Sequence, residues 1–213
     1  MVQGVIFDLD GVIVTTDDCH YRAWKRMADE EGIPFDRHIN ERLRGVSRMA
    51  SLEILLERAE KPYTVAQKEA MAARKNAYYV ELIDSLTPAD VLPGAMDVLH
   101  ALRARGIRIA IGSSSRNTPL ILRRIGLETA FDAVADGNQI THSKPDPEVF
   151  LLAARLMGLS PAVCLVVEDA DAGVEAALAG SMKALGVGSA AANPRATYRA
   201  ASLAEVNLDA VLA

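Results

Sequence analysis

The sequence predicts an α/β fold: a doubly wound parallel sheet with a Rossmann-like core, and a helical cap domain inserted after the first strand. Three observations carry this prediction. Short apolar runs of strand length each end in polar or glycine residues, helical patterns alternate with these runs, and one long stretch near the N-terminus breaks the alternation.

The predicted strands are apolar over nearly their whole length instead of alternating with polar residues. Such continuous runs are typical of strands that are buried on both faces of a parallel sheet. They read "VQGVIFDLD" (2–10), "IRIAIGSSS" (107–115), "AVCLVVEDA" (162–170) and "MKALGVG" (182–188). Helical patterns lie between them, at residues 94–105, 118–125 and 147–157. In sheets of this kind, ligands bind at the carboxyl ends of the strands.

The stretch from about residue 15 to residue 88 has no strand pattern. It contains helical patterns only, over residues 17–32, 47–60 and 64–86. It is too long for an ordinary connection between a strand and a helix. We therefore expect a catalytic α/β core of residues 1–14 and 91–213, and a helical cap of residues 15–90.

Composition limits the classes of partner. Half of the residues are apolar, the net charge is −5, and the basic residues form no long block. These features argue against nucleic acid or a membrane surface as a partner. Cys19 and Cys164 are far apart and match no metal-ligand spacing, which favours a reduced, cytoplasmic protein.

The first strand ends in two aspartates, in the motif "FDLDGV". Residues two apart on a strand point to the same side, so the charges of Asp8 and Asp10 repel each other. Aspartate and glycine are also common in plain turns at strand ends. Two carboxylates on one face, however, need a counter-charge to remain ionised together. Mg²⁺ supplies one and prefers oxygen ligands.

A second acidic pair, Glu168 and Asp169, follows the run "CLVV". Because the carboxyl ends of parallel strands meet at one edge of the sheet, both acidic pairs are expected at that edge. Together they predict a site for a hard cation.

Two further motifs are expected near the same edge. Lys144 stands in "SKPDP", where Pro147 fits the first position of a helix and Asp146 its cap, so Lys144 either is solvated or balances charge in the site. The Lys144–Pro145 peptide bond can take either isomer. The serine-rich loop "GSSSRN" precedes a helix, an arrangement that suits an oxyanion such as phosphate, although such loops are often only loops.

Together these groups fit phosphoryl transfer. A carboxylate at the strand end attacks phosphorus, while the cation and the lysine stabilise the charge of the transferring group. The second aspartate is placed to act as general acid and base.

In their order along the chain, "DLDGV", the serine after the second strand, "SKPDP" and "ED" resemble the four motifs of the haloacid dehalogenase superfamily. The resemblance implies that Asp8 is the nucleophile and Asp10 the general acid/base. It implies that Ser113, Ser114 and Lys144 hold the transferring phosphate. It also implies a Mg²⁺ site made of Asp8, Asp10 through its backbone carbonyl, Glu168 and Asp169, with Glu168 either a ligand or one layer behind the ligands.

Within the superfamily, the chain is similar to the sugar phosphomutases. The resemblance lies in the cap segments "RLRGVSR" and "ARKNAYYV", and in His20, placed in the loop before the cap. It implies that His20 couples cap closure to the alignment of Asp10. The substrate would be bound by Gly45, Val46, Ser47, Arg48, Lys75, Asn76, Ser114, Ser115, Arg116 and Asn117. Taken from their surroundings alone, Lys75 and Asn76 read as an exposed helix face.

The implied reaction interconverts β-glucose 1-phosphate and glucose 6-phosphate through a bisphosphate. The partners are then small sugar phosphates, and a cap that opens and closes favours a monomer. A sugar-phosphate phosphatase with the same core is the nearest alternative. A phosphoacceptor signalling domain would lack so long a helical cap, and a non-catalytic binding module would not need Asp8. Trp24, Met27, Met71, Tyr78 and Tyr79 are expected to be packing residues of the cap.

Overall fold

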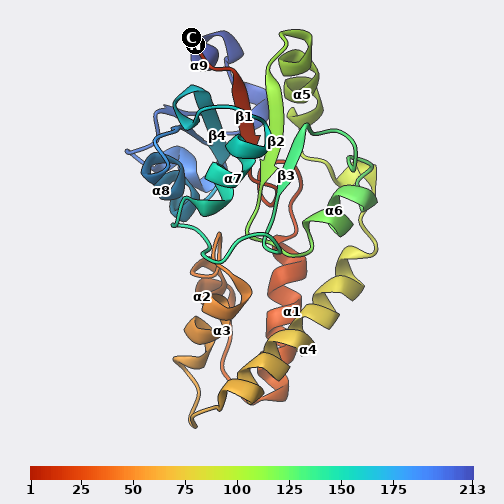
Figure 1. Ribbon diagram of the computed structural model, residues 1–213. Helices are drawn as coiled ribbons and strands as arrows, with labels where there is room; N and C mark the ends of the chain where they lie inside the picture. The colour runs from red at the N-terminus through yellow and green to blue at the C-terminus, as the bar shows by residue number, and fades with distance from the viewer.

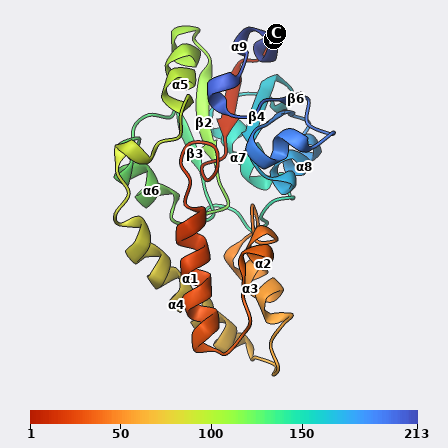
Figure 2. The same ribbon diagram turned by 180° about the vertical axis from the view of Figure 1, so that it is seen from behind.

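The protein, described over residues 1–213 by a computed structural model, has a sheet-containing lobe and a helical lobe. Figure 1 shows helices α1 to α4 beyond the carboxyl ends of the strands, and the view from behind in Figure 2 shows the same arrangement. The predicted α/β fold with an inserted helical cap is confirmed. No helix combines the length and the apolar character that a membrane span requires.

The sheet has six parallel strands in the order β3-β2-β1-β4-β5-β6. Their bounds are β1 Gly4–Phe7, β2 Arg108–Gly112, β3 Ala133–Ala135, β4 Cys164–Glu168, β5 Lys183–Gly186 and β6 Tyr198–Arg199. The sequence predicts β1, β2, β4 and β5. The strands β3 and β6 were not predicted, because edge strands of three and two residues leave too short an apolar run to recognise.

Helices cover both faces of the sheet. On β1, Val5 and Phe7 pack on one face with residues of α5, α6 and α9, whereas Ile6 packs on the other with residues of α7 and α8. The helices are α5 Ala95–Ala104, α6 Thr118–Arg124, α7 Glu148–Leu156, α8 Asp171–Ala179 and α9 Leu208–Leu212. Four short 3-10 helices complete the core lobe, at Pro88–Asp90, Pro161–Val163, Gly188–Ala192 and Leu203–Glu205.

The cap has four helices and an apolar core of its own, which includes Trp24, Met27 and Met71. The helices are α1 Asp17–Glu30, α2 Arg37–Glu41, α3 Arg48–Leu56 and α4 Val65–Ile83. Helix α2 was not predicted, because its five residues are too few for a helical period. The expected domain bounds, 15–90 for the cap, remain a prediction.

The two chain segments that join the lobes lie side by side. Val14, before α1, forms an antiparallel bridge with Val91, and the Leu92 N–H donates to the Ile13 carbonyl at 2.9 Å. Upstream, Gly11 takes φ +84°, and a Cβ there would lie 2.1 Å from the Asp169 carboxylate. Glycine is therefore required at the turn of "FDLDGV", both by the backbone conformation and by the space available.

Candidate active site

A cavity of about 480 Å³ lies between the cap and the carboxyl ends of the strands. It brings together residues from the first, second and third predicted strands and from the cap. Every site residue predicted from the sequence lines this cavity except Glu168: Asp8, Asp10, His20, Gly45, Val46, Ser47, Arg48, Lys75, Asn76, Ser113, Ser114, Ser115, Arg116, Asn117, Lys144 and Asp169.

Lys144 lies between two carboxylates at the edge of the sheet. Its Nζ donates to Asp8 Oδ1 at 2.6 Å and to Glu168 Oε1 at 2.5 Å, and its side chain is only 1% exposed. Burial opposes its charge, but the carboxylates of Asp8 and Glu168 outweigh that effect and raise its pKa. Lys144 is thus a fixed positive charge and not a solvated side chain.

The turn that carries Lys144 differs slightly from the prediction. The Lys144–Pro145 peptide bond is cis. Helix α7 starts at Glu148 with Pro147 in the cap position, one residue later than expected. Asp146 still accepts a hydrogen bond from the Glu148 N–H at 2.9 Å, so its side chain caps the helix although its position is shifted.

Glu168 lies behind the cavity wall. Its Oε1 accepts from Lys144, and its Oε2 accepts from the Ala170 N–H at 2.9 Å. A Cβ at Gly173 on α8 would lie 1.9 Å from Glu168 Oε1. The carboxylate therefore needs a glycine on that helix in order to reach Lys144.

We predict that Gly173→Ala lowers turnover at least about tenfold, because the added methyl displaces Glu168 and breaks its bond to buried Lys144. Steady-state turnover, measured with the free energy of unfolding from urea titration, tests this. Gly4→Ala is the control, since its Cβ also enters crowded space but meets Leu159 at 2.5 Å, far from Lys144. Equal losses of turnover in the two variants would contradict the prediction.

Asp10 is held by the residue that precedes α1. The Thr16 N–H donates to Asp10 Oδ1 at 2.6 Å, and the Thr16 hydroxyl donates to Oδ2 at 2.5 Å. Burial raises the pKa of Asp10 to about 7, and the charges of Asp17 and Asp8 add to this effect against the Thr16 bonds. A carboxyl group with a pKa near neutrality is suited to both accept and release a proton.

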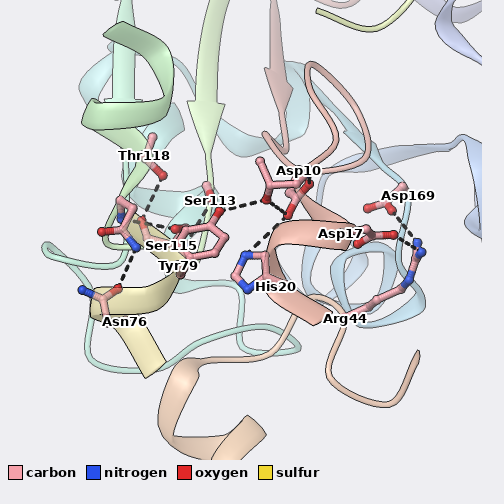
Figure 3. A network of polar contacts seen from close by, with 12 residues as sticks. Asp10, Asp17, His20, Arg44, Asn76, Tyr79, Ser113, Ser115, Thr118 and Asp169 are labelled. Atoms are coloured by element: carbon pink, nitrogen blue, oxygen red, sulfur yellow. Dashed lines mark hydrogen bonds and ion pairs between the residues drawn. The ribbon is translucent and has the colours of Figure 1, made fainter. Parts of the chain in front are cut away.

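His20 lies inside helix α1, as the helical pattern over residues 17–32 predicts, and not in a loop before the cap, where the family resemblance placed it. Its Nε2 is 3.6 Å from Asp10 Oδ2, and its Nδ1 is 2.9 Å from Lys75 Nζ (Figure 3 shows the contact with Asp10). Burial, then the charges of Lys75 and Arg48, lower the pKa of His20 well below its ordinary value. His20 is therefore a neutral link between Asp10 and the cap.

Lys75 is buried, at 3% exposure, which corrects its expected place on an exposed helix face. Its Nζ lies over the rings of Trp24 and Tyr79, at 4.9 and 4.6 Å from their centroids. Burial, then the charge of Arg48, lowers its pKa to about 7. Neighbouring Asn76 accepts a hydrogen bond from the Asn117 side chain at 2.9 Å, which joins cap to core.

Asp169 lies beside Asp8 and Glu168. Each of the three side chains has a carboxylate oxygen that lies within 4.8 Å of an oxygen of the other two. Burial, then the charges of Glu168 and Asp8, raises the pKa of Asp169 to about 8. From the cap, Arg44 approaches Asp169 Oδ2 at 3.4 Å and also pairs with Asp17 (Figure 3). The cluster is a set of buried oxygen donors with excess negative charge, which fits a divalent cation.

The loop after β2 presents hydroxyl and amide groups to the cavity. The Ser115 N–H donates to Ser113 Oγ at 3.2 Å, and the Asn117 N–H donates to Ser115 Oγ at 3.2 Å. The hydroxyl of Ser114 is buried with no hydrogen-bond partner in the protein. An orphaned hydroxyl in a lining loop fits an oxyanion ligand.

Two arginines line the cavity without forming an ion pair. Arg48 is the first residue of α3, in the cap, and Arg116 lies in the serine loop of the core. Burial, then the charge of Arg116, lowers the pKa of Arg48. Neither side chain has a carboxylate within 4.0 Å. Two neighbouring cations that lack a protein anion favour a second anionic group of a ligand.

Sequence reasoning missed three residues around the cavity: Thr16, Arg44 and Tyr79. Thr16 directly precedes α1, where a threonine commonly caps a helix, but its hydroxyl binds Asp10 and not the helix. Arg44 stands in "RLRGVSR", where nothing in the spacing separates it from Arg42. Tyr79 was expected to be a packing residue, and its ring is buried, but its hydroxyl is 2.8 Å from Thr16 Oγ1.

The arrangement defines a class of protein. An acidic cluster at the end of β1, a buried lysine on a separate turn, a serine loop after β2 and a cap over the cavity are together suited to phosphoryl transfer through a carboxylate. The chain matches the haloacid dehalogenase-like hydrolases over residues 2–180. It therefore belongs to the haloacid dehalogenase-like hydrolase family.

Within this family, the chain is similar to β-phosphoglucomutases. It is 48% identical to the β-phosphoglucomutase of Bacillus subtilis, over 88% of this chain and 84% of that protein. A crystal structure of the β-phosphoglucomutase of Clostridium difficile matches with a TM-score of 0.94 and 38% identity, over 99% and 96% of the two chains. The fructose-1-phosphate phosphatase of Escherichia coli is 35% identical, over 86% of this chain and 95% of that protein.

Proposed function

We propose that this protein is a β-phosphoglucomutase, which interconverts β-D-glucose 1-phosphate and glucose 6-phosphate. The observation that carries the proposal is the cavity itself. It holds a carboxylate paired with a buried lysine and, in addition, two arginines, Arg48 and Arg116, that pair with no carboxylate of the protein. A bisphosphate intermediate has one phosphate that reacts and one that does not. It therefore needs two binding sites: the carboxylate–lysine pair for the reacting phosphate and the two arginines for the other. The similarity to β-phosphoglucomutases supports the same conclusion.

In the proposed reaction, Asp8 carries the phosphate as an aspartyl phosphate. Its Oδ1 is engaged by Lys144, whereas Oδ2 has no hydrogen-bond partner in the protein and is the oxygen we assign as nucleophile. Phospho-Asp8 passes its phosphate to the C6 hydroxyl of β-glucose 1-phosphate. The β-glucose 1,6-bisphosphate then turns round and returns the C1 phosphate to Asp8, which leaves glucose 6-phosphate.

Asp10 takes the proton from the C6 hydroxyl in the first transfer and returns it to the C1 oxygen in the second. Its pKa of about 7 serves both directions. Lys144, with the serine loop, balances the negative charge of the transferring group. His20 and Lys75 connect Asp10 to the cap, so that cap closure and proton transfer are coupled.

The acidic cluster fits Mg²⁺. We assign Asp8, Asp169 and the Asp10 backbone carbonyl as its protein ligands. Both oxygens of Glu168 are already engaged, by Lys144 and by the Ala170 N–H, so Glu168 supports the site from behind the ligands. When bound, the cation would neutralise negative charge on the transferring phosphoryl group.

A primed mutase assay tests the proposal. The protein is supplied with β-glucose 1-phosphate, Mg²⁺ and a trace of β-glucose 1,6-bisphosphate. We expect glucose 6-phosphate with little free phosphate. Mostly free glucose and phosphate would instead support the alternative function, a Mg²⁺-dependent sugar-phosphate phosphatase. The similarity to the Escherichia coli phosphatase is the reason to test this alternative.

Arg48→Ala should lower mutase turnover about tenfold to a hundredfold, because it removes a charge-assisted, bidentate contact with the non-reacting phosphate. Hydrolysis of p-nitrophenyl phosphate, which has no second phosphate, should fall much less. Arg42→Ala is the control, because Arg42 pairs with Glu57 on the surface of the cap. If Arg48→Ala lowers both activities equally, Arg48 does not hold a second phosphate.

We also propose that the enzyme acts in the cytoplasm and as a monomer. The proposed substrates are small sugar phosphates, and the cavity is enclosed by the cap and core of a single chain. Size-exclusion chromatography with light scattering would test the monomer directly.

A further inference from the structure

Tyr79 lies where the cap meets the core. It is on helix α4, it is 1% exposed, and it packs in the same apolar cluster as Val14 and Leu9 of the core. Its ring centroid is 4.1 Å from that of His20. The packing role expected from sequence explains the ring, but it does not explain the buried hydroxyl.

That hydroxyl begins a chain of hydrogen bonds to Asp10. Tyr79 OH is 2.8 Å from Thr16 Oγ1, and the Thr16 hydroxyl donates to Asp10 Oδ2 at 2.5 Å. A threonine hydroxyl has one hydrogen, and here Asp10 receives it. When Asp10 is ionised, the hydrogen between Tyr79 and Thr16 therefore comes from Tyr79. Figure 3 shows Tyr79, His20 and Asp10 close to one another in this network.

The direction of these two hydrogen bonds restricts the rotation of the Thr16 hydroxyl. A hydroxyl that donates one hydrogen bond and accepts none keeps some freedom to rotate about its Cβ–Oγ bond. The Thr16 hydroxyl also accepts a hydrogen bond from a fixed donor, so one rotation is favoured. Tyr79 is a fixed donor, because its ring is held between His20 and the apolar cluster. Hydrogen bonds in a buried chain also strengthen one another.

We propose that Tyr79 is a positioning residue for Asp10: from cap helix α4, its hydroxyl orients the Thr16 hydroxyl and so fixes the Asp10 carboxylate. Through these two hydrogen bonds, the position of cap helix α4 affects the position of Asp10, the general acid/base. This connection is separate from the contact between His20 and Lys75. This proposal rests on the proposed role of Asp10 in phosphoryl transfer.

The test is Tyr79→Phe, which removes the hydroxyl and keeps the ring, its stacking on His20 and its burial. We expect kcat of the mutase reaction to fall about fivefold, as the loss of one ordinary hydrogen bond would produce. KM for β-glucose 1-phosphate should stay within about twofold, because the hydroxyl acts through Thr16 and not on the sugar. Tyr78→Phe is the matched control, since the Tyr78 hydroxyl donates to Glu30 outside this network.

A spectroscopic measurement separates positioning from packing. The Thr16 N–H donates to Asp10 Oδ1 at 2.6 Å, so its proton resonance should lie far downfield. In ¹H–¹⁵N spectra of the substrate-free protein, Tyr79→Phe should move this resonance upfield, and Tyr78→Phe should leave it in place. In a Thr16→Val background, Tyr79→Phe should have no further effect on kcat.

Three results would overturn the proposal: an unchanged kcat in Tyr79→Phe, a lower kcat with an unmoved Thr16 resonance, or an equal loss of kcat in the Thr16→Val background. Failure of the proposed function has a different signature. In that case the wild-type protein produces no glucose 6-phosphate, while the Thr16 resonance still shows whether Tyr79 orients Thr16.

Discussion

Asp8→Asn is expected to lower mutase turnover at least about a thousandfold, because the variant lacks the oxygen nucleophile that we propose attacks phosphorus. The amide has nearly the same shape as the carboxylate, and its oxygen can still accept the hydrogen bond that Lys144 now donates to Oδ1 at 2.6 Å. The variant should therefore fold. Turnover in the primed assay and the intact mass of the protein after incubation with the bisphosphate measure the effect. The wild-type protein should gain one phosphate, and the variant none.

Asp132→Asn is the matched control for this acid-to-amide change. Asp132 Oδ2 accepts from the Ile109 N–H at 2.8 Å, a bond that the amide oxygen can replace, and Asp132 does not line the cavity. It should retain turnover. If Asp8→Asn kept more than a small part of the wild-type rate, Asp8 would not be the nucleophile, and a binding role for the site would gain support.

Lys144→Met is expected to lower both turnover and stability. The change leaves Asp8 and Glu168 in a buried place without their shared cation. Removing one partner from a buried ion pair costs about 3–5 kcal/mol of the free energy of unfolding. Turnover should fall at least about a hundredfold, because the charge that balances the transferring phosphate is lost. Urea unfolding in the absence of divalent cations and the primed assay measure the two effects.

Lys183→Met provides the comparison. Lys183 is also on the sheet and donates to the Tyr198 hydroxyl at 3.2 Å and to Ala213 O at 3.3 Å, but it forms no ion pair with an aspartate or a glutamate. We expect a much smaller loss of stability and no loss of turnover. A Lys144→Met protein as stable as Lys183→Met would show that the two carboxylates do not depend on Lys144 for their burial.

The fold could be predicted where the sequence has long apolar runs. The strands β1, β2, β4 and β5 are central or next to central, and both of their faces are covered, so their apolar character is continuous. The edge strands β3 and β6 have too few residues for any period, and only their pairing with Ala110–Gly112 and with Leu185–Gly186 defines them. A local sequence pattern cannot predict the pairing of strands that are separated along the chain.

The candidate site could be predicted where motifs follow strands. Asp8 and Asp169 lie at one edge as predicted, because parallel strands bring their carboxyl ends together. For Lys144, in the turn before α7, the sequence left a solvated place and a place in the site both open, and the structure buries it in the site. Burial on helices was harder to foresee: Lys75 looks exposed in its own helical pattern, and it is buried only because Trp24 and Tyr79 pack around it. Contacts of the Thr16 and Tyr79 hydroxyls join residues 63 positions apart, and no local signal in the sequence records them.

The bridge between Val14 and Val91 limits how the cap can move. Because these two segments are bonded to each other, and Leu92 donates to Ile13, they cannot flex as independent tethers. Their shared bridge makes this point a common attachment of cap to core. Thr16 lies two residues from Val14, beside this attachment. A cap movement about this attachment would therefore displace Thr16, which binds Asp10, less than residues further out in the cap.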